Sequence, residues 1–398
     1  MTQHLPPLKV GVAGVGVMGR NHARVLSDIR DFDLTAVFDP EAATAEGVAG
    51  LYDARAFTVA ADFVAAGLDA AVVATPNRHH AELGVALLEA GVHVLVEKPI
   101  AATVADAQRM IDAAKANSRV LMVGHVERFN PAVEAVKRAI DGDDVISIQI
   151  TRVGPFPPRM GEVGVVIDLA VHDIDIIRHL TGSEMTEVQS LLGHAHASRE
   201  DSALLQFRMD NGVIAHITTN WVTPYKVRTL QVATMNRFVV ADLITRQVTE
   251  YFGQQADGSY QTRAVNSWPA EPLKKELEAF AHAIRTGETP AVTGEDGCMR
   301  RARSRRTCRN LRFPITACPL SSPAVRRRAA KAIRAIASIA IAAGAVSTIA
   351  RATKAATIAN RVRTRRSLPK RSPIPPNNQS SISILSPAEI FPAVTTRA

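Results

Sequence analysis

Cysteine is absent from residues 1–297, because all three cysteines lie in residues 298–398. The larger part of the chain therefore cannot form a disulfide framework, and it is compatible with a reducing cytoplasm, which is the predicted location. The first residues also lack the pattern of a secretory signal peptide. Aromatic residues make up only 5% of the chain, and no internal repeat is visible.

Acidic residues are almost absent from residues 298–398, which contain 21 Lys and Arg but a single acid, Glu389. Residues 1–297 contain 26 Lys and Arg against 37 Asp and Glu, and they hold all twelve histidines. We hypothesise that the basic segment is an out-of-frame translation of GC-rich DNA, and resequencing around codon 297 would test this. Its uncharged, alanine-rich stretch, residues 335–350, is short for a membrane span, and no DNA-binding motif is visible. We therefore expect neither a membrane nor a nucleic acid as a partner.

A glycine-rich segment follows the first apolar run of the chain, residues 8–13. Gly14, Gly16 and Gly19 form G-x-G-x-x-G, a helical pattern follows, and a second apolar run ends at Asp39. These features predict a dinucleotide on a strand–turn–helix unit, with the pyrophosphate at the helix N-terminus. Asp39 would accept hydrogen bonds from a ribose and repel a 2′-phosphate, which favours NAD over NADP. The predicted cofactor contacts here are Gly14, Gly16, Val17, Met18, Gly19 and Asp39.

Strands alternate with helices up to about residue 140, which predicts a doubly wound parallel sheet of the Rossmann type. The expected strands are 8–13, 33–38, 69–74, 92–96 and 119–123, and the expected helices are 17–29, 78–90, 103–116 and 128–140.

Residues 184–252 alternate with a period of two, which predicts an α+β second domain with an open, mostly antiparallel sheet. Its clearest strands are 203–209, 213–221, 228–233 and 238–241, with Asn211-Gly212 as the turn of one hairpin. Residues 273–284 are expected to form an amphipathic helix. We predict an NAD-binding domain over 1–124, a substrate and oligomerisation domain over 125–297, and an atypical basic tail over 298–398.

Acidic and histidine residues recur at helical spacing between residues 164 and 180. Asp168 and His172 are four residues apart, and Asp175 and His179 follow on the same predicted face. Asp168 could orient His172 as a carboxylate orients a catalytic imidazole. Ordinary acid–histidine pairs on a helix and a metal site are the alternatives. We favour catalysis and predict no metal, because no further cluster completes a metal shell.

Lys98 directly follows an apolar strand in the sequence Glu97-Lys98-Pro99. Ligands of doubly wound sheets bind at the carboxyl ends of strands, so Lys98 would lie beside a bound nicotinamide. Burial and a positive neighbour would lower its pKa and let it help to deprotonate an alcohol. The alternative is a solvated surface lysine.

The chain resembles the glucose–fructose oxidoreductase/inositol dehydrogenase (Gfo/Idh/MocA) family over about residues 8–297. The resemblance rests on the motifs above, on Thr75-Pro76-Asn77 and on the stretch from Ala90 to Pro99. The resemblance implies a sugar or inositol dehydrogenase that forms homodimers or homotetramers. It places Asn77 and Glu97 along the cofactor, Lys98 beside the reacting hydroxyl, and Asp168 and His172 in catalysis. Thr75 and His80 complete the implied cofactor contacts.

The strings 125–131 and 164–175 most resemble a subgroup that oxidises the 3-hydroxyl of nucleotide-linked N-acetylhexosamines. Polar residues near these strings are candidate substrate contacts, although ordinary surface positions would also explain the arginines. The candidates are His125, Arg128, Asn130, Arg152, Arg159 and Asp175. The predicted function is an NAD-dependent sugar dehydrogenase. The alternatives are an inositol or free-sugar dehydrogenase, and a non-catalytic NAD-binding regulator with a basic nucleic-acid arm.

Overall fold

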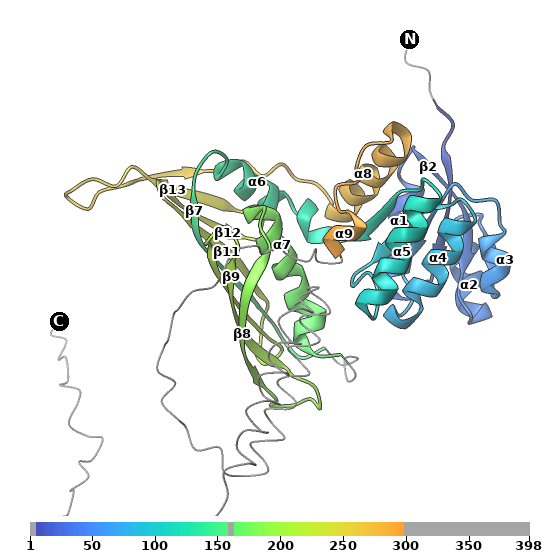
Figure 1. Cartoon of the computed structure of the whole chain (residues 1–398), viewed down its shortest axis with the longest axis horizontal. Helices are drawn as coiled ribbons and strands as arrows, with labels where there is room; N and C mark the ends of the chain where they lie inside the picture. Colours follow the sequence, from blue (N-terminus) through green and yellow to red (C-terminus); the bar gives the residue numbers. More distant parts are fainter. Residues whose placement is uncertain (1–4, 158–162, 298–398) are drawn as a thin grey trace, which may run out of the picture. The chain divides into compact units, whose positions relative to one another are not determined.

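A computed structural model of the protein describes residues 5–157 and 163–297 (Figure 1). The predicted substrate contact Arg159 and the basic tail at 298–398 lie outside these ranges. Two sheets, each with its own buried apolar cluster, organise the described part of the chain.

The first sheet is parallel and has the strand order β3-β2-β1-β4-β5-β6, which confirms the doubly wound fold. Its strands are β1 (Leu8–Ala13), β2 (Phe32–Phe38), β3 (Arg55–Phe57), β4 (Ala70–Val73), β5 (His93–Glu97) and β6 (Leu121–Gly124). The order reverses between β1 and β4, and ligands of such sheets bind at the carboxyl ends of the strands beside this reversal. The turn after β1 carries the glycine motif, and the turn after β4 carries Thr75 and Asn77.

Five α-helices and one 3-10 turn connect these strands. They are α1 (Val17–Ser27), α2 (Ala42–Ala49), α3 (Ala60–Val64), η1 (Asn77–His79), α4 (His80–Glu89) and α5 (Val104–Ala116). Helix α5 begins where the Thr103 side chain accepts a hydrogen bond from the Asp106 amide at 3.1 Å, a standard N-cap. Sequence analysis did not predict α2, β3 or α3, which are short elements.

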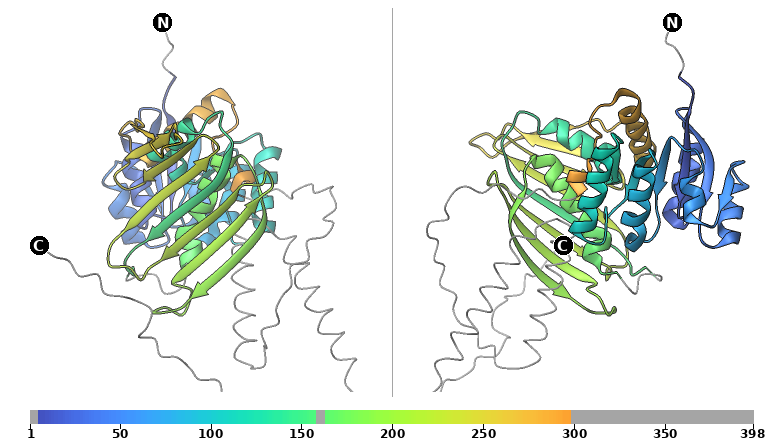
Figure 2. Two further views of the ribbon diagram at one scale, coloured as in Figure 1. Left: turned by 90° about the vertical axis from the view of Figure 1, so that its left-hand side faces the viewer. Right: turned by 45° about the vertical axis from the view of Figure 1, so that its right-hand side comes forward.

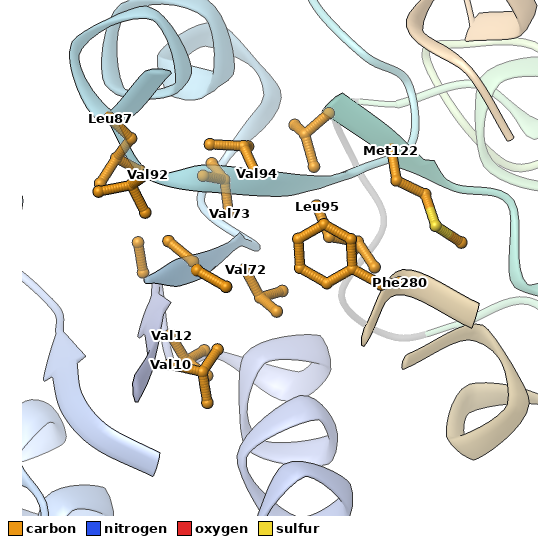
Figure 3. Close-up of a cluster of buried hydrophobic side chains, with 14 of the residues drawn as sticks. Val10, Val12, Val72, Val73, Leu87, Val92, Val94, Leu95, Met122 and Phe280 are labelled. Atoms are coloured by element: carbon orange, nitrogen blue, oxygen red, sulfur yellow. The ribbon is translucent and has the colours of Figure 1, made fainter. Parts of the chain in front are cut away.

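The core of the first sheet is completed by a helix from near the end of the described chain. Helix α8 (Pro272–Thr286) buries Leu277 and Phe280 in this core, and Figure 3 shows Phe280 close to Leu95. Phe280 also stacks on Phe32, with 6.3 Å between ring centroids. The short helix α9 (Gly294–Gly297) packs near α5 and β6. The chain therefore returns to its first sheet after forming the second.

The second sheet has the order β14-β13-β12-β11-β7-β10-β9-β8 and is antiparallel except where β7 and β10 pair. Its strands are β7 (Val145–Val153), β8 (Met185–Gly193), β9 (Ser202–Met209), β10 (Ile214–Asn220), β11 (Val227–Thr234), β12 (Arg237–Asp242), β13 (Val248–Phe252) and β14 (Gln261–Ala264). The predicted turn at Asn211-Gly212 joins β9 to β10, and Gly212 has a φ of +92°. This confirms the predicted open, mostly antiparallel sheet.

Helical segments pack on one face of the second sheet. They are α6 (Pro131–Ala139), η3 (Val166–Ala170) and α7 (Val171–Thr181). The 3-10 turn η2 (Val126–Phe129) precedes α6 and packs against α8, with Phe129 in the core of the first sheet. The side chains of Ile148, Ile150, Leu230 and Val232 are buried on this inner face. The opposite face carries no helix in the described part of the chain, as the left view of Figure 2 shows. No helix in residues 5–157 or 163–297 is long and apolar enough to cross a membrane.

Candidate active site

In the glycine loop after β1, the backbone of Gly14 lies close to the backbone of Thr75, and the backbone of Gly19 lies close to that of Gly14. Gly14 has a φ of +83°, and a Cβ on it would lie 2.7 Å from the backbone of Thr75. A Cβ on Gly19 would lie 1.8 Å from the carbonyl oxygen of Gly14, so the first turn of α1 fits only without a side chain there. A Cβ on Gly16 would meet nothing within 4 Å. The loop is thus closed around Gly14 and Gly19 but open in front of Gly16.

The N-terminus of α1 is available to an anion. Gly16 is its N-cap residue and no side chain caps the helix, while Val17 is 71% exposed. Helix N-termini with uncapped N–H groups bind phosphate readily. Asp39, after β2, is half-buried, and its Oδ2 accepts a hydrogen bond from the Val15 amide at 3.0 Å. Asp39 therefore also holds the glycine loop in place.

Thr75 and Asn77 follow β4 and face the same strand reversal. The hydroxyl of Thr75 and the side-chain carbonyl of Asn77 are buried, and neither finds a hydrogen-bond partner in the described chain. Buried polar atoms normally have a partner, so these two are suited to a bound molecule. The open space at Gly16, the uncapped helix and these two polar atoms fit a dinucleotide.

His80 and Glu97 make hydrogen bonds that hold the turns of the site together. The two ring nitrogens of buried His80 lie 2.7 Å from the Thr75 carbonyl oxygen and 3.0 Å from that of Pro99. His80 thereby connects the turns after β4 and β5, and burial lowers its pKa. Both side chains are thus hydrogen-bonded within the protein, and the cofactor contacts predicted for His80 and Glu97 stay predictions.

Glu97 pairs with a histidine that sequence analysis missed. Its Oε1 lies 2.9 Å from Nε2 of His22, which is fully buried on α1, and its Oε2 accepts from the Lys98 amide at 3.2 Å. Burial alone would raise the pKa of Glu97, but the His22 hydrogen bond and the Lys98 charge outweigh it and lower that pKa. The signal for His22 was its place three residues after Gly19, on the buried side of the helix.

Lys98 ends β5 and reaches the helical segment that carries Asp168. Its Nζ donates to the backbone carbonyl of Asp168 at 2.9 Å and lies 3.9 Å from the Asp168 carboxylate. Burial lowers the Lys98 pKa, the Asp168 and Glu97 charges oppose this, and the Arg152 charge adds to it. The ammonium is therefore held where the first sheet meets the segment before α7.

Asp168 does not hydrogen-bond His172, which corrects the predicted pairing. Residues Val166–Ala170 form a π-helical turn, in which one turn takes more residues than in an α-helix. Side chains four residues apart therefore do not stack, and the Asp168 carboxylate lies by Lys98 instead. Nδ1 of His172 is buried and has no hydrogen-bond partner in the described chain.

The surroundings of His172 keep its ring neutral. Its pKa lies well below 6.5, first because of burial and then because of nearby positive charges, of which Lys98 is the strongest and Arg152 the next. The side chain is only half-buried by surface area. A neutral imidazole at the surface, close to an ammonium, can accept a proton from a molecule bound there. The structure thus brings Lys98, Asp168 and His172 together.

The described substrate candidates are all buried, and most are hydrogen-bonded within the protein, but Nδ1 of His125 has no hydrogen-bond partner in the described chain. Arg128 donates two hydrogen bonds of 2.7 Å to the Asp175 carboxylate, and His125 Nδ1 lies 3.7 Å from the same group. Asn130 caps α6 by accepting from the Ala132 amide at 3.0 Å. Arg128, Asn130 and Asp175 therefore stabilise the junction of η2 with α6 and α7. The substrate contacts predicted for these three residues and for His125 stay predictions.

Arg152 is also buried, at 2% exposure. It donates to Asp173 at 2.8 Å and to Glu127 at 3.0 Å. Burial raises the pKa of Asp173 to about 6, although the Arg152 charge opposes this. Two acids thus compensate the buried guanidinium, as burial of such a charge requires, while Nη2 of Arg152 has no hydrogen-bond partner in the described chain. The substrate contact predicted for Arg152 stays a prediction.

No group of three or more metal-ligating side chains occurs in the described residues. The polar groups of the site are instead the Thr75 hydroxyl, the Lys98 ammonium and the His172 imidazole, which lie around the edge of the first sheet where a nucleotide would bind. A Rossmann domain with a lysine and a histidine at that edge defines an oxidoreductase that uses a nicotinamide cofactor.

Comparison with known proteins agrees with this class. Residues 8–125 match the model of the GFO/IDH/MocA oxidoreductase family with its NAD-binding Rossmann fold, and residues 142–239 match the GFO/IDH/MocA C-terminal domain. The chain belongs to this family.

Two curated relatives show the range of activities in the family. The chain is 30% identical over 283 residues to a UDP-N-acetylglucosamine 3-dehydrogenase from Acidithiobacillus ferrooxidans, covering 70% of this chain and 88% of the relative. It is 28% identical over 309 residues to a myo-inositol 2-dehydrogenase from Thermotoga maritima, covering 73% and 92%. A solved structure of the Acidithiobacillus enzyme matches with a TM-score of 0.69 at 28% identity, over 74% of this chain and 94% of that one.

Proposed function

We propose that the protein is an NAD-dependent dehydrogenase that oxidises the 3-hydroxyl of a UDP-N-acetylhexosamine. The observation that carries the proposal is the meeting of Lys98, Asp168 and His172 beside the nucleotide-binding edge. The substrate is supported by the similarity to the UDP-N-acetylglucosamine enzyme. An inositol dehydrogenase is the second candidate, supported by the similarity to the Thermotoga enzyme.

The residues present fit an NAD molecule. The N-terminus of α1 and the space at Gly16 would hold the pyrophosphate, and Asp39 would accept hydrogen bonds from the adenosine ribose. The unpartnered oxygens of Thr75 and Asn77 would face the nicotinamide half. The negative charge of Asp39 favours NAD over NADP, because a 2′-phosphate would be repelled there.

When bound, the cofactor supplies the hydride acceptor for the oxidised carbon. The neutral imidazole of His172 takes the proton of the substrate hydroxyl. The ammonium of Lys98 donates a hydrogen bond to the same oxygen and stabilises the negative charge that grows on it. Asp168 holds Lys98 in position through its carbonyl and its carboxylate. The products are a 3-keto sugar and the reduced cofactor.

The test is spectrophotometric NADH formation by the full chain with UDP-N-acetylglucosamine, other UDP-sugars and myo-inositol, each with NAD and with NADP. We expect turnover with a UDP-N-acetylhexosamine and NAD. Turnover with myo-inositol alone would replace the first candidate by the second. No turnover with any polyol or sugar would contradict both.

We also propose that the protein forms a homo-oligomer through the face of the second sheet on which the described residues place no helix. Leu191 and Leu204 lie opposite each other on β8 and β9, and Ile214 follows on β10; all are at least 48% exposed. Exposed apolar side chains on one face mark an association surface. Light scattering of the Leu204→Glu variant should show a smaller species than the wild type, and a monomeric wild type would contradict the proposal. The cytoplasmic location stays a prediction.

A further inference from the structure

Arg228 stands on the inner face of the second sheet, where the apolar pattern of β11 would place a core residue. Leu230 and Val232 on the same strand are fully buried, and alternate residues of a strand share a face. Arg228 pairs across the sheet with Arg152 on β7. Two guanidinium groups therefore lie side by side at the end of this face, yet Arg152 is buried and the Arg228 side chain is 33% exposed.

The acids near this arginine pair are already engaged. Glu127 Oε1 accepts from Arg152 at 3.0 Å and from Arg228 at the longer distance of 3.4 Å, while Glu127 Oε2 accepts from Asn130 at 3.1 Å. Asp173 accepts from Arg152 at 2.8 Å. One carboxylate oxygen of Glu127 thus accepts hydrogen bonds from two guanidinium groups, and the bond from Arg228 is the longer one.

The position of Arg228 relates it to the reacting groups. Its charge is among those that lower the pKa of His172, and the Asp168 carboxylate acts on Arg228 in turn. Arg152 and its partner Asp173, which directly follows His172, connect Arg228 to the same helix. The Arg228 guanidinium is partly exposed and, among the described residues, donates the single hydrogen bond of 3.4 Å to Glu127. Such a group near the proton-accepting histidine is suited to an anion on the substrate.

We propose that Arg228 is a specificity-determining residue that binds the phosphoryl group carried by the sugar substrate. This inference rests on the proposed function and deepens it, because neutral polyols have no group that needs this cation. A planar guanidinium forms paired hydrogen bonds with phosphate oxygens, which a hydroxyl group cannot match in charge. Arg228 thereby favours nucleotide sugars over inositol and free sugars.

The test compares Arg228→Gln and Arg228→Lys with the wild type in the full chain. Arg208→Gln is the matched control, since Arg208 lies on β9 of the same sheet, is exposed and loses the same charge. The readouts are kcat and KM for UDP-N-acetylglucosamine, the binding constants of UDP and of NADH, and the melting temperature. For Arg228→Gln we expect the KM for the nucleotide sugar and the Kd of UDP to rise about 10- to 100-fold. The NADH affinity and the melting temperature of Arg228→Gln should equal those of the wild type. Arg228→Lys should recover part of the lost affinity for UDP and for the nucleotide sugar. Arg208→Gln should behave as the wild type.

The inference is overturned if Arg228→Gln leaves UDP affinity unchanged, if kcat falls while KM stays constant, or if the melting temperature falls together with NADH affinity. If the wild type oxidises UDP-N-acetylglucosamine and substitution of Arg228 changes neither the KM nor the Kd of UDP, this inference alone is disproved. A wild type that oxidises only inositol, and does not bind UDP, disproves the proposed substrate as well.

Discussion

The glycine loop after β1 and the inner face of the second sheet hold the two halves of the site by different means. The loop relies on backbone, because its fit depends on missing side chains at Gly14 and Gly19 and on one carboxylate, Asp39. The inner face relies on charged side chains, with Arg152 fixed between Glu127 and Asp173. The loop should therefore respond to steric changes, whereas the inner face should respond to changes of charge.

The largest effect is expected when the proposed proton acceptor, which lies in the charged half of the site, is removed. His172→Ala should reduce kcat by about 10²- to 10⁴-fold, the usual contribution of a general base. NADH affinity should be retained, because the cofactor side is built from other residues. Steady-state kinetics and fluorescence titration measure both. His216→Ala, at an exposed histidine on β10, is the control. Full turnover by His172→Ala would contradict the mechanism.

Steric sensitivity of the loop can be tested with two alanines. Gly19→Ala should destabilise the fold by about 1–3 kcal/mol, because its Cβ would lie 1.8 Å from the backbone carbonyl oxygen of Gly14, which must shift. Gly16→Ala meets no atom within 4 Å, so it should leave the melting temperature unchanged and weaken only NADH binding. Equal melting temperatures for both variants would show that the loop is not closed as described.

The charge on Asp39 should set the choice of cofactor. Asp39→Asn keeps an oxygen that can accept from the Val15 amide, but it removes the negative charge. The ratio of kcat/KM for NAD over NADP should fall about 10- to 100-fold, the value of a hydrogen bond to a charged group. Asp33→Asn, on the exposed side of β2, should leave the ratio unchanged. If Asp39→Asn has the same ratio of kcat/KM for NAD over NADP as the wild type, Asp39 does not determine the choice of cofactor.

The smallest expected effect concerns stability against pH. Glu276 on α8 is fully buried, neither carboxylate oxygen has a partner in the described chain, and burial together with the Glu97 and Asp175 charges raises its pKa well above 4.5. The folded state therefore keeps a proton that the unfolded chain releases. Its stability contribution is full below pH 4.5 and falls as the pH rises toward the folded pKa, by at most about 1.4 kcal/mol per pH unit.

Glu276→Gln should remove this dependence, so its melting temperature should exceed that of the wild type more at pH 8 than at pH 5. Glu278→Gln, exposed on the same helix, is the control and should show no such difference. Parallel pH curves for Glu276→Gln and the wild type would mean that the carboxyl is not held neutral in the fold.

Local patterns predicted the nucleotide-binding half of the molecule well. The glycine motif, the strand β1 and the placement of Lys98 directly after β5 follow from short stretches of sequence. The short elements β3 and α3 escaped because they hold too few residues to show a period. The antiparallel sheet followed from alternation, and its turn at Gly212 from the Asn-Gly pair.

The charged half was less predictable for a physical reason. A sequence does not show whether an arginine is solvated or buried, because that depends on acids far away in the chain, such as Asp175 for Arg128. The π-helical turn that separates Asp168 from His172 leaves no mark in residue spacing. Arg228 was visible only as a polar residue in the apolar register of a strand.

Helix α8 closes the first core with side chains that are synthesised after the entire second sheet. A nascent chain must therefore emerge from the ribosome to about Thr286 before Leu277 and Phe280 can cover the nucleotide-binding half. Until then that half presents an apolar surface to chaperones. A reading-frame change upstream of α8 would remove this cover, whereas one after Gly297 would spare it.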